Sequence, residues 1–233
     1  MSILGWLVSV VYKALFLTGD SGYKLAHPLA KLVIIASVAA FIAQHPVHAP
    51  VLIPLVLVLG FIYPGSEWVV AASLLSLLAG AYLAVSAYLL SLLGLYYMSL
   101  VDVVLVALRT YAISIAILFL FNTISPVDLY NALYYLKAGS SSNYPLLLWR
   151  LIPQGLKNFA EAISLSVVKG EKAVKRIPAA VASVIEAGWF IEEYCYWRLR
   201  TKPQSPISSM ASPKHTLILL VAALAIALLS RVL

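Results

Sequence analysis

Charge is scarce in this sequence. Of its 233 residues, only 11% are charged and 63% are hydrophobic, whereas a soluble domain has about 25% charged residues. Residues 32–66 and 68–101 contain no Asp, Glu, Lys or Arg. A chain with so few charges cannot cover its surface with polar groups, so its solvent is lipid. This composition excludes a water-soluble globular protein and predicts an all-α polytopic membrane protein.

Other absences narrow the chemistry. The single cysteine, Cys195, excludes an intrachain disulfide. The sequence has no GxSxG, HExxH or CxxC motif and no glycine-rich phosphate loop. His45 and His48 are three residues apart, but Pro46 breaks the helix that would align them as metal ligands. We therefore expect no catalytic residue, no metal site and no cofactor.

The hydrophobic segments predict about five transmembrane helices, near residues 28–44, 50–63, 68–101, 102–122 and 215–233. Residues 3–17 are apolar but short and are interrupted by Lys13, so we expect them to lie along the interface. As one helix, residues 68–101 would be about 50 Å long, against a hydrocarbon core of about 30 Å. That segment must therefore project beyond the bilayer, tilt steeply, or break near Gly80 or Gly94. It can count as one transmembrane span or as two.

Amphipathic helices are predicted after the fourth hydrophobic segment. Ser125, Pro126 and Asp128 are residue types typical of an N-cap, a first helical position and a first-turn acid, so they indicate a helix start. Residues 144–168 and 178–200 carry their polar side chains on one stripe of an otherwise apolar helix. Such helices are too polar to cross the bilayer and too apolar to stand alone in water. Each needs a protein or membrane surface on one face.

The charge distribution predicts topology. Ten of the sixteen Lys and Arg residues lie between Lys137 and Lys202, and the net charge is +7. Basic residues mark the cytoplasmic side of membrane proteins, so this excess indicates orientation rather than nucleic-acid binding. Counting residues 68–101 as one span places the N-terminus and the basic helices together in the cytoplasm, and we prefer it. The expected regions are a membrane region, 1–123, a cytoplasmic region, 124–202, and a linker with a last transmembrane helix, 203–233.

Two charges lie near the membrane interior. Asp102 is expected to cap a helix. Arg109 lies two turns further in and needs a partner or a water-filled crevice, which makes it the better functional candidate.

Two stretches and the order of the elements resemble a known family. Residues 19–32 read GDSGYKLAHPLAKL, and after Arg109 residues 123–136 read TISPVDLYNALYYL. They are similar to the patterns G-D-S-x-x-H-x-L-D-P-R-x-K-L and T-[ST]-P-x-x-L-x-x-A-L-x-x-L of the transmembrane T component of energy-coupling factor (ECF) transporters. That family includes the cobalt-transport permeases, and it too has amphipathic coupling helices followed by one closing hydrophobic helix.

The family's coupling motifs correspond to two short sites in this chain. Family members carry an Ala-Arg-Gly-like motif at the end of each of two long coupling helices. By position these are VKG at residues 168–170 and LRT at residues 199–201. The basic residue is kept in both and the glycine only in the first. The resemblance thus implies that Lys169, Gly170 and Arg200 contact the ATPases.

The resemblance also implies a transport function. A T component is a non-catalytic subunit that joins two cytoplasmic ATP-binding-cassette (ABC) ATPases to a substrate-binding S component in the membrane, for uptake of vitamins or metal ions. Arg109, Pro126 and Asp128 are then candidates for partner contact or conformational change. The expected sliding face toward the S component comprises Leu148, Ile152, Phe159 and Ile163.

Two other functions are compatible with the sequence. One is a membrane enzyme acting on a lipid-linked substrate at the cytoplasmic interface through Glu161, Glu186 or Glu192. The adjacent acids Glu192 and Glu193 face different directions, which does not favour a carboxylate pair. The other is a structural scaffold. The basic residues at helix ends also have a purely structural interpretation, since cations favour the helix C-terminus.

Overall fold

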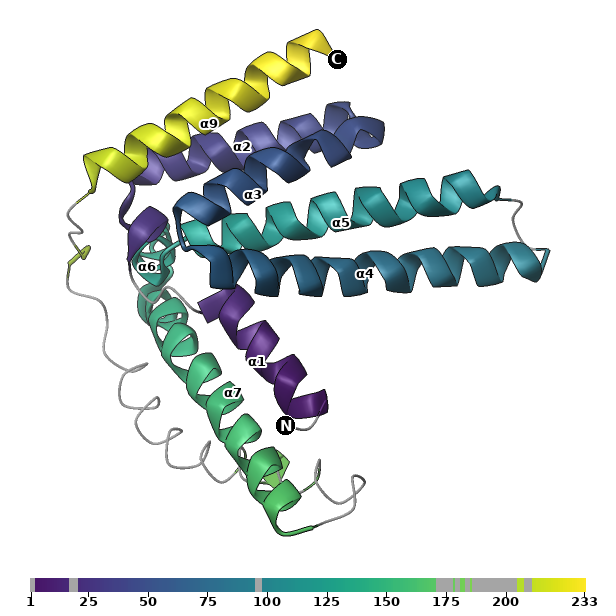
Figure 1. Ribbon diagram of the computed structural model, residues 1–233. Helices are drawn as coiled ribbons and strands as arrows, with labels where there is room; N and C mark the ends of the chain where they lie inside the picture. The colour runs from purple at the N-terminus through teal and green to yellow at the C-terminus, as the bar shows by residue number, and fades with distance from the viewer. Residues whose placement is uncertain are drawn as a thin grey trace. The chain divides into compact units, whose positions relative to one another are not determined.

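The computed structural model describes residues 3–16, 21–94, 98–170, 178, 181–182, 185, 205–207 and 211–233. Its α-helices are α1 (Ile3–Phe16), α2 (Pro28–Gln44), α3 (Leu52–Ile62), α4 (Ser66–Leu92), α5 (Leu100–Thr123), α6 (Pro126–Tyr135), α7 (Tyr144–Val168) and α9 (Pro213–Val232) (Figure 1). Three short 3-10 helices are η1 (Gly22–Leu25), η2 (Pro46–Val51) and η3 (Gly139–Asn143). No strand occurs among the described residues, so the predicted all-α class is confirmed.

Three helices, α4, α5 and α9, are long and apolar enough to cross a membrane. The chain is therefore a helical, multi-pass membrane protein. The other predicted spans are shorter: α2 has 17 residues, about 26 Å at 1.5 Å per residue, and η2 and α3 together cover Pro46–Ile62. Residues 178–200, predicted as the last amphipathic helix, fall almost entirely outside the described residues.

The chain packs as two units. We call Lys13–Ile124 with Met210–Leu233 the membrane unit, and Met1–Tyr12 with Ser125–Ser209 the amphipathic unit. The last hydrophobic helix, α9, belongs to the membrane unit, where it packs along α2. In the amphipathic unit, α6 packs on η3 and α7.

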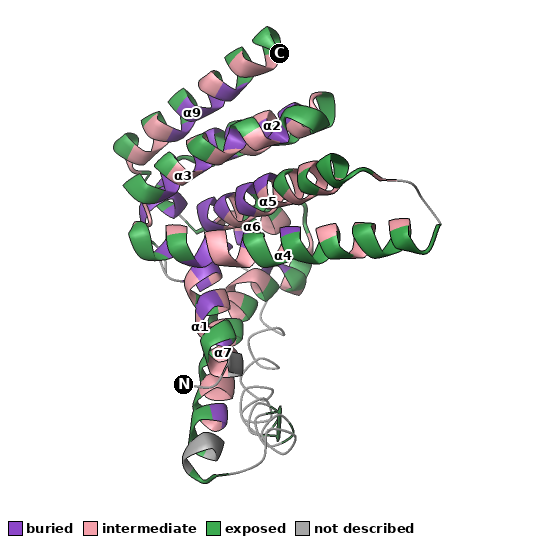
Figure 2. Ribbon diagram, turned by 45° about the vertical axis from the view of Figure 1, so that its right-hand side comes forward, coloured by how far each residue is buried: buried purple, intermediate pink, exposed green. Residues whose placement is uncertain are grey.

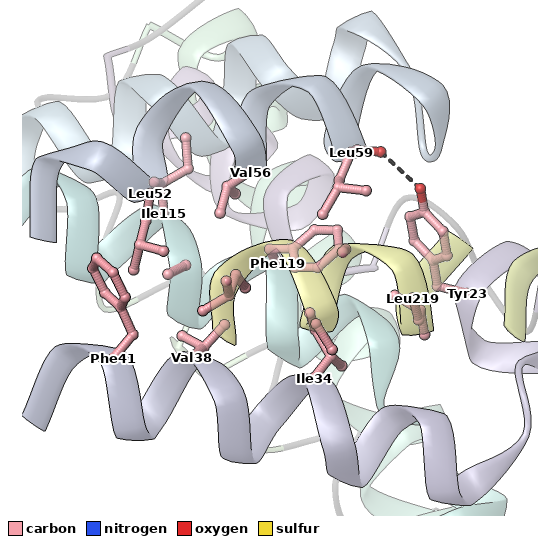
Figure 3. Packing of buried hydrophobic residues seen from close by; sticks show 14 of the residues in the cluster. Tyr23, Ile34, Val38, Phe41, Leu52, Val56, Leu59, Ile115, Phe119 and Leu219 are labelled. Atoms are coloured by element: carbon pink, nitrogen blue, oxygen red, sulfur yellow. Dashed lines mark hydrogen bonds between the residues drawn. The ribbon is translucent and has the colours of Figure 1, made fainter. Parts of the chain in front are cut away.

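A single buried cluster holds the membrane unit together. Its side chains come from η1, α2, α3, α4, α5 and α9. Tyr23 and Leu59 lie at one end of the cluster, and Phe41, Leu52 and Ile115 lie at the other (Figure 3). The cluster is narrow compared with the helices around it, since many large apolar side chains of α4, α5 and α9 remain exposed (Figure 2). This is the pattern expected where lipid, and not water, surrounds the helices.

Of the two positions considered for a break, Gly80 and Gly94, the helix does not break at Gly80. α4 continues through Gly80 and ends at Leu92. Gly94 follows with a φ of 71°, in the left-handed region that favours glycine, and α5 begins at Leu100. Residues 68–92 therefore lie in one long helix that ends close to Gly94.

Gly80 instead allows α4 and α5 to approach each other closely. A Cβ atom at Gly80 would lie 2.8 Å from the carbonyl oxygen of Ala107. Small residues at helix contacts are the usual means of packing helices in lipid, where no hydrophobic force drives the helices together.

We expect Gly80→Ala to destabilise the α4–α5 pair by about 1–3 kcal/mol, because the added methyl group meets backbone that cannot move aside. The midpoint of denaturant unfolding in detergent measures the effect. Val85→Leu, which enlarges an exposed side chain of the same helix, is the control. Equal midpoints for the two variants would contradict the close packing at Gly80.

Candidate functional site

The start of α6 is built as the sequence predicts. The Ser125 side chain accepts hydrogen bonds from the amides of Val127 and Asp128, and Asp128 accepts one from the Ser125 amide at 3.0 Å. Pro126 occupies the first turn, where its missing N–H costs nothing. Pro126 and Asp128 are thus brought together in one helix cap.

The same device begins α5. Ser99 and Asp102 form a reciprocal capping box, with the Ser99 hydroxyl donating to Asp102 at 2.7 Å. The predicted capping role of Asp102 is confirmed.

Two further residues of α6 hold the chain segment that returns from the basic region. The Asn131 amide group donates to the carbonyl oxygen of Ile207 and accepts from its N–H, both at 2.9 Å. The Tyr130 hydroxyl donates to the carbonyl oxygen of Ser205 at 3.0 Å. Sequence reasoning missed both residues, although an asparagine in so apolar a helix is itself a signal. Three hydrogen bonds therefore join α6 to residues 205–207.

The polar stripe predicted on residues 144–168 is present on α7. Arg150, Gln154, Lys157 and Glu161 are exposed, and Lys157 and Glu161 form an ion pair of 3.9 Å one turn apart. Glu161, a candidate for the enzyme alternative, is thus a paired residue on an exposed face. Glu186 and Glu192 lie outside the described residues.

The apolar face of α7 is only partly available. Leu148 is 51% exposed and Ile152 is 46% exposed, whereas Phe159 is half-buried. Ile163 is only 1% exposed. The expectation that Ile163 belongs to a partner-binding face is therefore wrong, because the chain itself covers that side chain.

The first coupling motif lies at the end of α7. Lys169 and Gly170 form the turn after the helix and both are exposed. The Lys169 amide donates to the carbonyl oxygen of Leu165 at 3.0 Å, and Gly170 has a φ of 71°, which ends the helix as a C-terminal glycine does. Arg200, in the second motif, lies outside the described residues, so no geometry relates it to Lys169.

Arg109 lies in α5, separate from the other candidates. Its side chain is half-buried, and its Nε is buried without a hydrogen-bond partner among the described residues. Asp102, two helical turns nearer the start of α5, interacts with Arg109 electrostatically.

The end of the membrane unit near residue 23 is organised by Tyr23. Its ring contacts the rings of Tyr63, Phe119 and His215 with centroids 5.6–5.7 Å apart. Its hydroxyl donates to the carbonyl oxygen of Leu59 at 3.0 Å (Figure 3). Burial raises the pKa of Tyr23 to about 12, so the hydroxyl remains protonated and able to donate at neutral pH.

A second junction at this end is the carbonyl oxygen of Ala14. It accepts hydrogen bonds from Trp68 Nε1 at 2.9 Å and from Asn122 Nδ2 at 2.7 Å. Next to it, Lys13 and Glu67 form an ion pair of 3.1 Å. The end of α1 and the facing ends of α4 and α5 are thereby joined.

The stretch that resembles the family's N-terminal motif lies in the same place. Of residues 19–32, the first two fall outside the described residues. Lys24 and Lys31, at the family's His and Lys positions, are each 3% exposed, and Lys31 Nζ donates to the carbonyl oxygen of Lys24. His27 and Leu29, which replace the family's Asp and Arg, flank the start of α2, and the His27 ring accepts from the Leu29 amide at 3.2 Å. The motif positions thus include buried residues that join segments.

The described residues contain no group of three His, Cys, Asp or Glu side chains able to hold a metal ion. Comparisons with models of protein families, with curated proteins and with solved structures give no match for this chain. The likeness to ECF T components consequently rests on the two sequence stretches and the order of the helices.

We expect Asn131→Leu to release the segment at Ile207, because this nearly isosteric change removes both hydrogen bonds. The exposed backbone groups of Ile207 then bind water instead, at a cost of about 0.5–1.5 kcal/mol for each hydrogen bond lost. Hydrogen–deuterium exchange at the Ile207 amide measures the change and should become faster. Asn158→Leu, on α7, is the matched control. Unchanged exchange at Ile207 in the Asn131 variant would contradict this role.

Proposed function

We propose that this protein is the transmembrane coupling subunit of an ECF-type ABC importer. In this role it transmits the ATP-driven motion of two cytoplasmic ABC ATPases to a substrate-binding subunit in the membrane, for uptake of a vitamin or a metal ion. The subunit is non-catalytic and ATP is hydrolysed by its partners. The observation that carries the proposal is α7, an amphipathic helix with an exposed apolar strip that ends in the exposed pair Lys169 and Gly170.

The surface of α7 supports a helix-in-groove contact. Leu148 and Ile152 expose about half of their side chains one turn apart, while Arg150 and Lys157 are exposed on the polar face. Such a helix can present its apolar strip to one partner and its basic end to an acidic groove of another. In the proposed complex, the ATPases supply such grooves to the basic ends of the coupling helices.

The packing of α2 supports the five-span topology. The His27 amide donates to Thr216 Oγ1 at 2.9 Å near one end of α2, and His45 Nε2 lies 3.0 Å from the carbonyl oxygen of Ser230 near the other. Thus α2 accompanies the spanning helix α9 over its whole length and is well placed to cross the same lipid. The helix pair η2–α3 then returns, giving five spans with α4, α5 and α9.

This topology places one end of the membrane unit in the cytoplasm. Residues 21–27, 63–65 and 124 lie at the end that Tyr23 organises, and the basic region follows residue 124 directly. The N-terminal lysines and the coupling helices are then on the cytoplasmic side, as the positive-inside rule requires. The protein is placed in the cell membrane with its N-terminus inside.

The mechanism follows from charge and mechanical connection. Basic side chains at the ends of the coupling helices pair with acidic groups of the ATPases, each pair contributing roughly 1.5–3 kcal/mol. When the ATPases close on ATP, the two helix ends are drawn together and the helices rotate or splay. The exposed apolar strip of α7 then moves against the substrate-binding subunit.

We expect Lys169→Glu combined with Arg200→Glu to weaken ATPase binding roughly 10- to 100-fold, since about 1.4 kcal/mol corresponds to a factor of ten. The measurement is the amount of ABC ATPase, and of ATP hydrolysis, that co-purifies with the tagged chain from native membranes. Lys214→Glu makes the same charge change at an exposed residue of α9, outside the coupling helices, and should have little effect. If the wild-type chain recovers no ABC ATPase, the proposal is wrong.

The topology has its own test. In a chain with Cys195→Ala, a cysteine introduced at the exposed His48 should react with a membrane-impermeant maleimide in intact cells. A cysteine at the exposed Ser141 should react only after permeabilisation. The reverse pattern would overturn the proposed orientation, and labelling of both sites in intact cells would overturn the number of spans.

A further inference from the structure

The helices of the membrane unit reach different heights. Phe41, Leu52 and Ile115 lie together at one end of the buried cluster (Figure 3). Beyond Phe41, α2 continues for only about 5 Å to its last residue, whereas beyond Ile115, α5 continues for about 22 Å toward its first residue. α9 ends level with α2, because His45 Nε2 lies 3.0 Å from the carbonyl oxygen of Ser230. The α4–α5 pair thus projects about 18 Å beyond α2 and α9 (Figure 1).

The outside of this projecting hairpin, residues 81–94 and 98–108, is apolar. Its only charged residue is Asp102, which caps α5. Five of its large side chains are 66% or more exposed: Tyr82, Leu92, Leu93, Leu100 and Val101. α9 is about 30 Å long, the thickness of the hydrocarbon core, so its end marks the border of the lipid tails. The hairpin carries its apolar surface past that border.

Arg109 stands at the base of the projecting hairpin. It lies about 9 Å beyond Ile115 along α5. Its Nε is fully buried, and within the described residues its guanidinium makes neither a hydrogen bond nor an ion pair. A permanent cation at the edge of a low-dielectric region requires an anion. Asp102, two turns away along α5, interacts with Arg109 electrostatically without forming an ion pair, so a carboxylate or a phosphate from outside the chain can still pair with the guanidinium.

The exposed apolar side chains of the hairpin distinguish between a phosphate and a carboxylate as the partner of Arg109. A phospholipid phosphate can pair with Arg109, but its tails end at the border and leave the apolar side chains beyond it uncovered. An integral membrane protein that stands as tall as the hairpin covers those side chains and also brings a carboxylate, which a guanidinium binds through two parallel hydrogen bonds. The combination of an unpaired cation and an apolar wall above it favours the protein.

We propose that Arg109 and the projecting hairpin form a docking surface for the substrate-binding membrane subunit, which places an Asp or Glu carboxylate against Arg109 and an apolar helix face against Leu100 and Val101. This inference rests on the proposed function and assigns that subunit a contact separate from α7. The hairpin holds the subunit by its membrane part, while α7 transmits motion to it.

The test compares variants of the tagged full chain purified from native membranes. Arg109→Gln removes the cation, and Leu100→Gln with Val101→Gln makes the wall polar at exposed positions that folding does not need. Arg231→Gln, an exposed arginine at the same end of the membrane unit, is the control. Mass spectrometry quantifies the co-purified membrane protein, the ATPases and bound phospholipid, and the thermal unfolding midpoint in detergent reports folding.

We expect both docking variants to lose the substrate-binding subunit at least 10-fold while retaining the ATPases, with Arg109→Lys intermediate and Arg231→Gln unchanged. Retention of the subunit by both docking variants would overturn the inference alone. Loss of bound phospholipid with retention of the subunit would assign Arg109 to a lipid phosphate and overturn it as well. Loss of the ATPases too would overturn a contact specific to one partner. If the wild-type chain co-purifies with ATPases but with no second membrane protein, only this inference is wrong. If it co-purifies with neither, the proposed function is wrong as well.

Discussion

The membrane unit depends on a set of contacts that gather around Tyr23. In lipid, helices gain no hydrophobic free energy by packing on one another, so shape and hydrogen bonding must position them. Tyr23 provides both: its ring meets rings of Tyr63, Phe119 and His215, which follow α3, lie in α5 and begin α9. Its hydroxyl binds the end of α3 at Leu59. Four segments far apart in sequence are thereby fixed at one end of the unit.

The opposite end of the membrane unit is organised differently. There α2 and α9 are joined through polar contacts of His45 and Gln44 with Ser230, whereas α4 and α5 continue alone, held together by the close approach at Gly80 and Ala107. The membrane unit is thus joined through several segments at the Tyr23 end, whereas the α4–α5 pair stands apart at the other end. The amphipathic unit has a corresponding division, with a closed base at Asn131 and an exposed end at Lys169.

The local features of this structure follow from the sequence more closely than the long-range ones. The bounds of α2 and α7 and the caps at Asp102 and Asp128 were predicted, because periodicity and capping depend on residues a few positions apart. The positions of Tyr23, Trp68 and Asn122 were not, since their partners lie up to 108 residues away and nothing in the spacing encodes them. Because charges are scarce in the sequence, Arg109 could be predicted as a functional candidate, but the burial of its Nε depends on tertiary packing and could not. Burial of Ile163 was missed for the same reason.

The pair of hydrogen bonds between Asn131 and Ile207 closes a loop across a separation of 76 residues. The entropy of closing a loop grows only with the logarithm of its length, so doubling the loop costs about 0.6 kcal/mol. Because these hydrogen bonds hold the two ends of the loop together, the segment between them can gain or lose residues without disturbing α6 or α9. The region between Asn131 and Ile207 is thus the part of the chain whose length is free to vary during evolution.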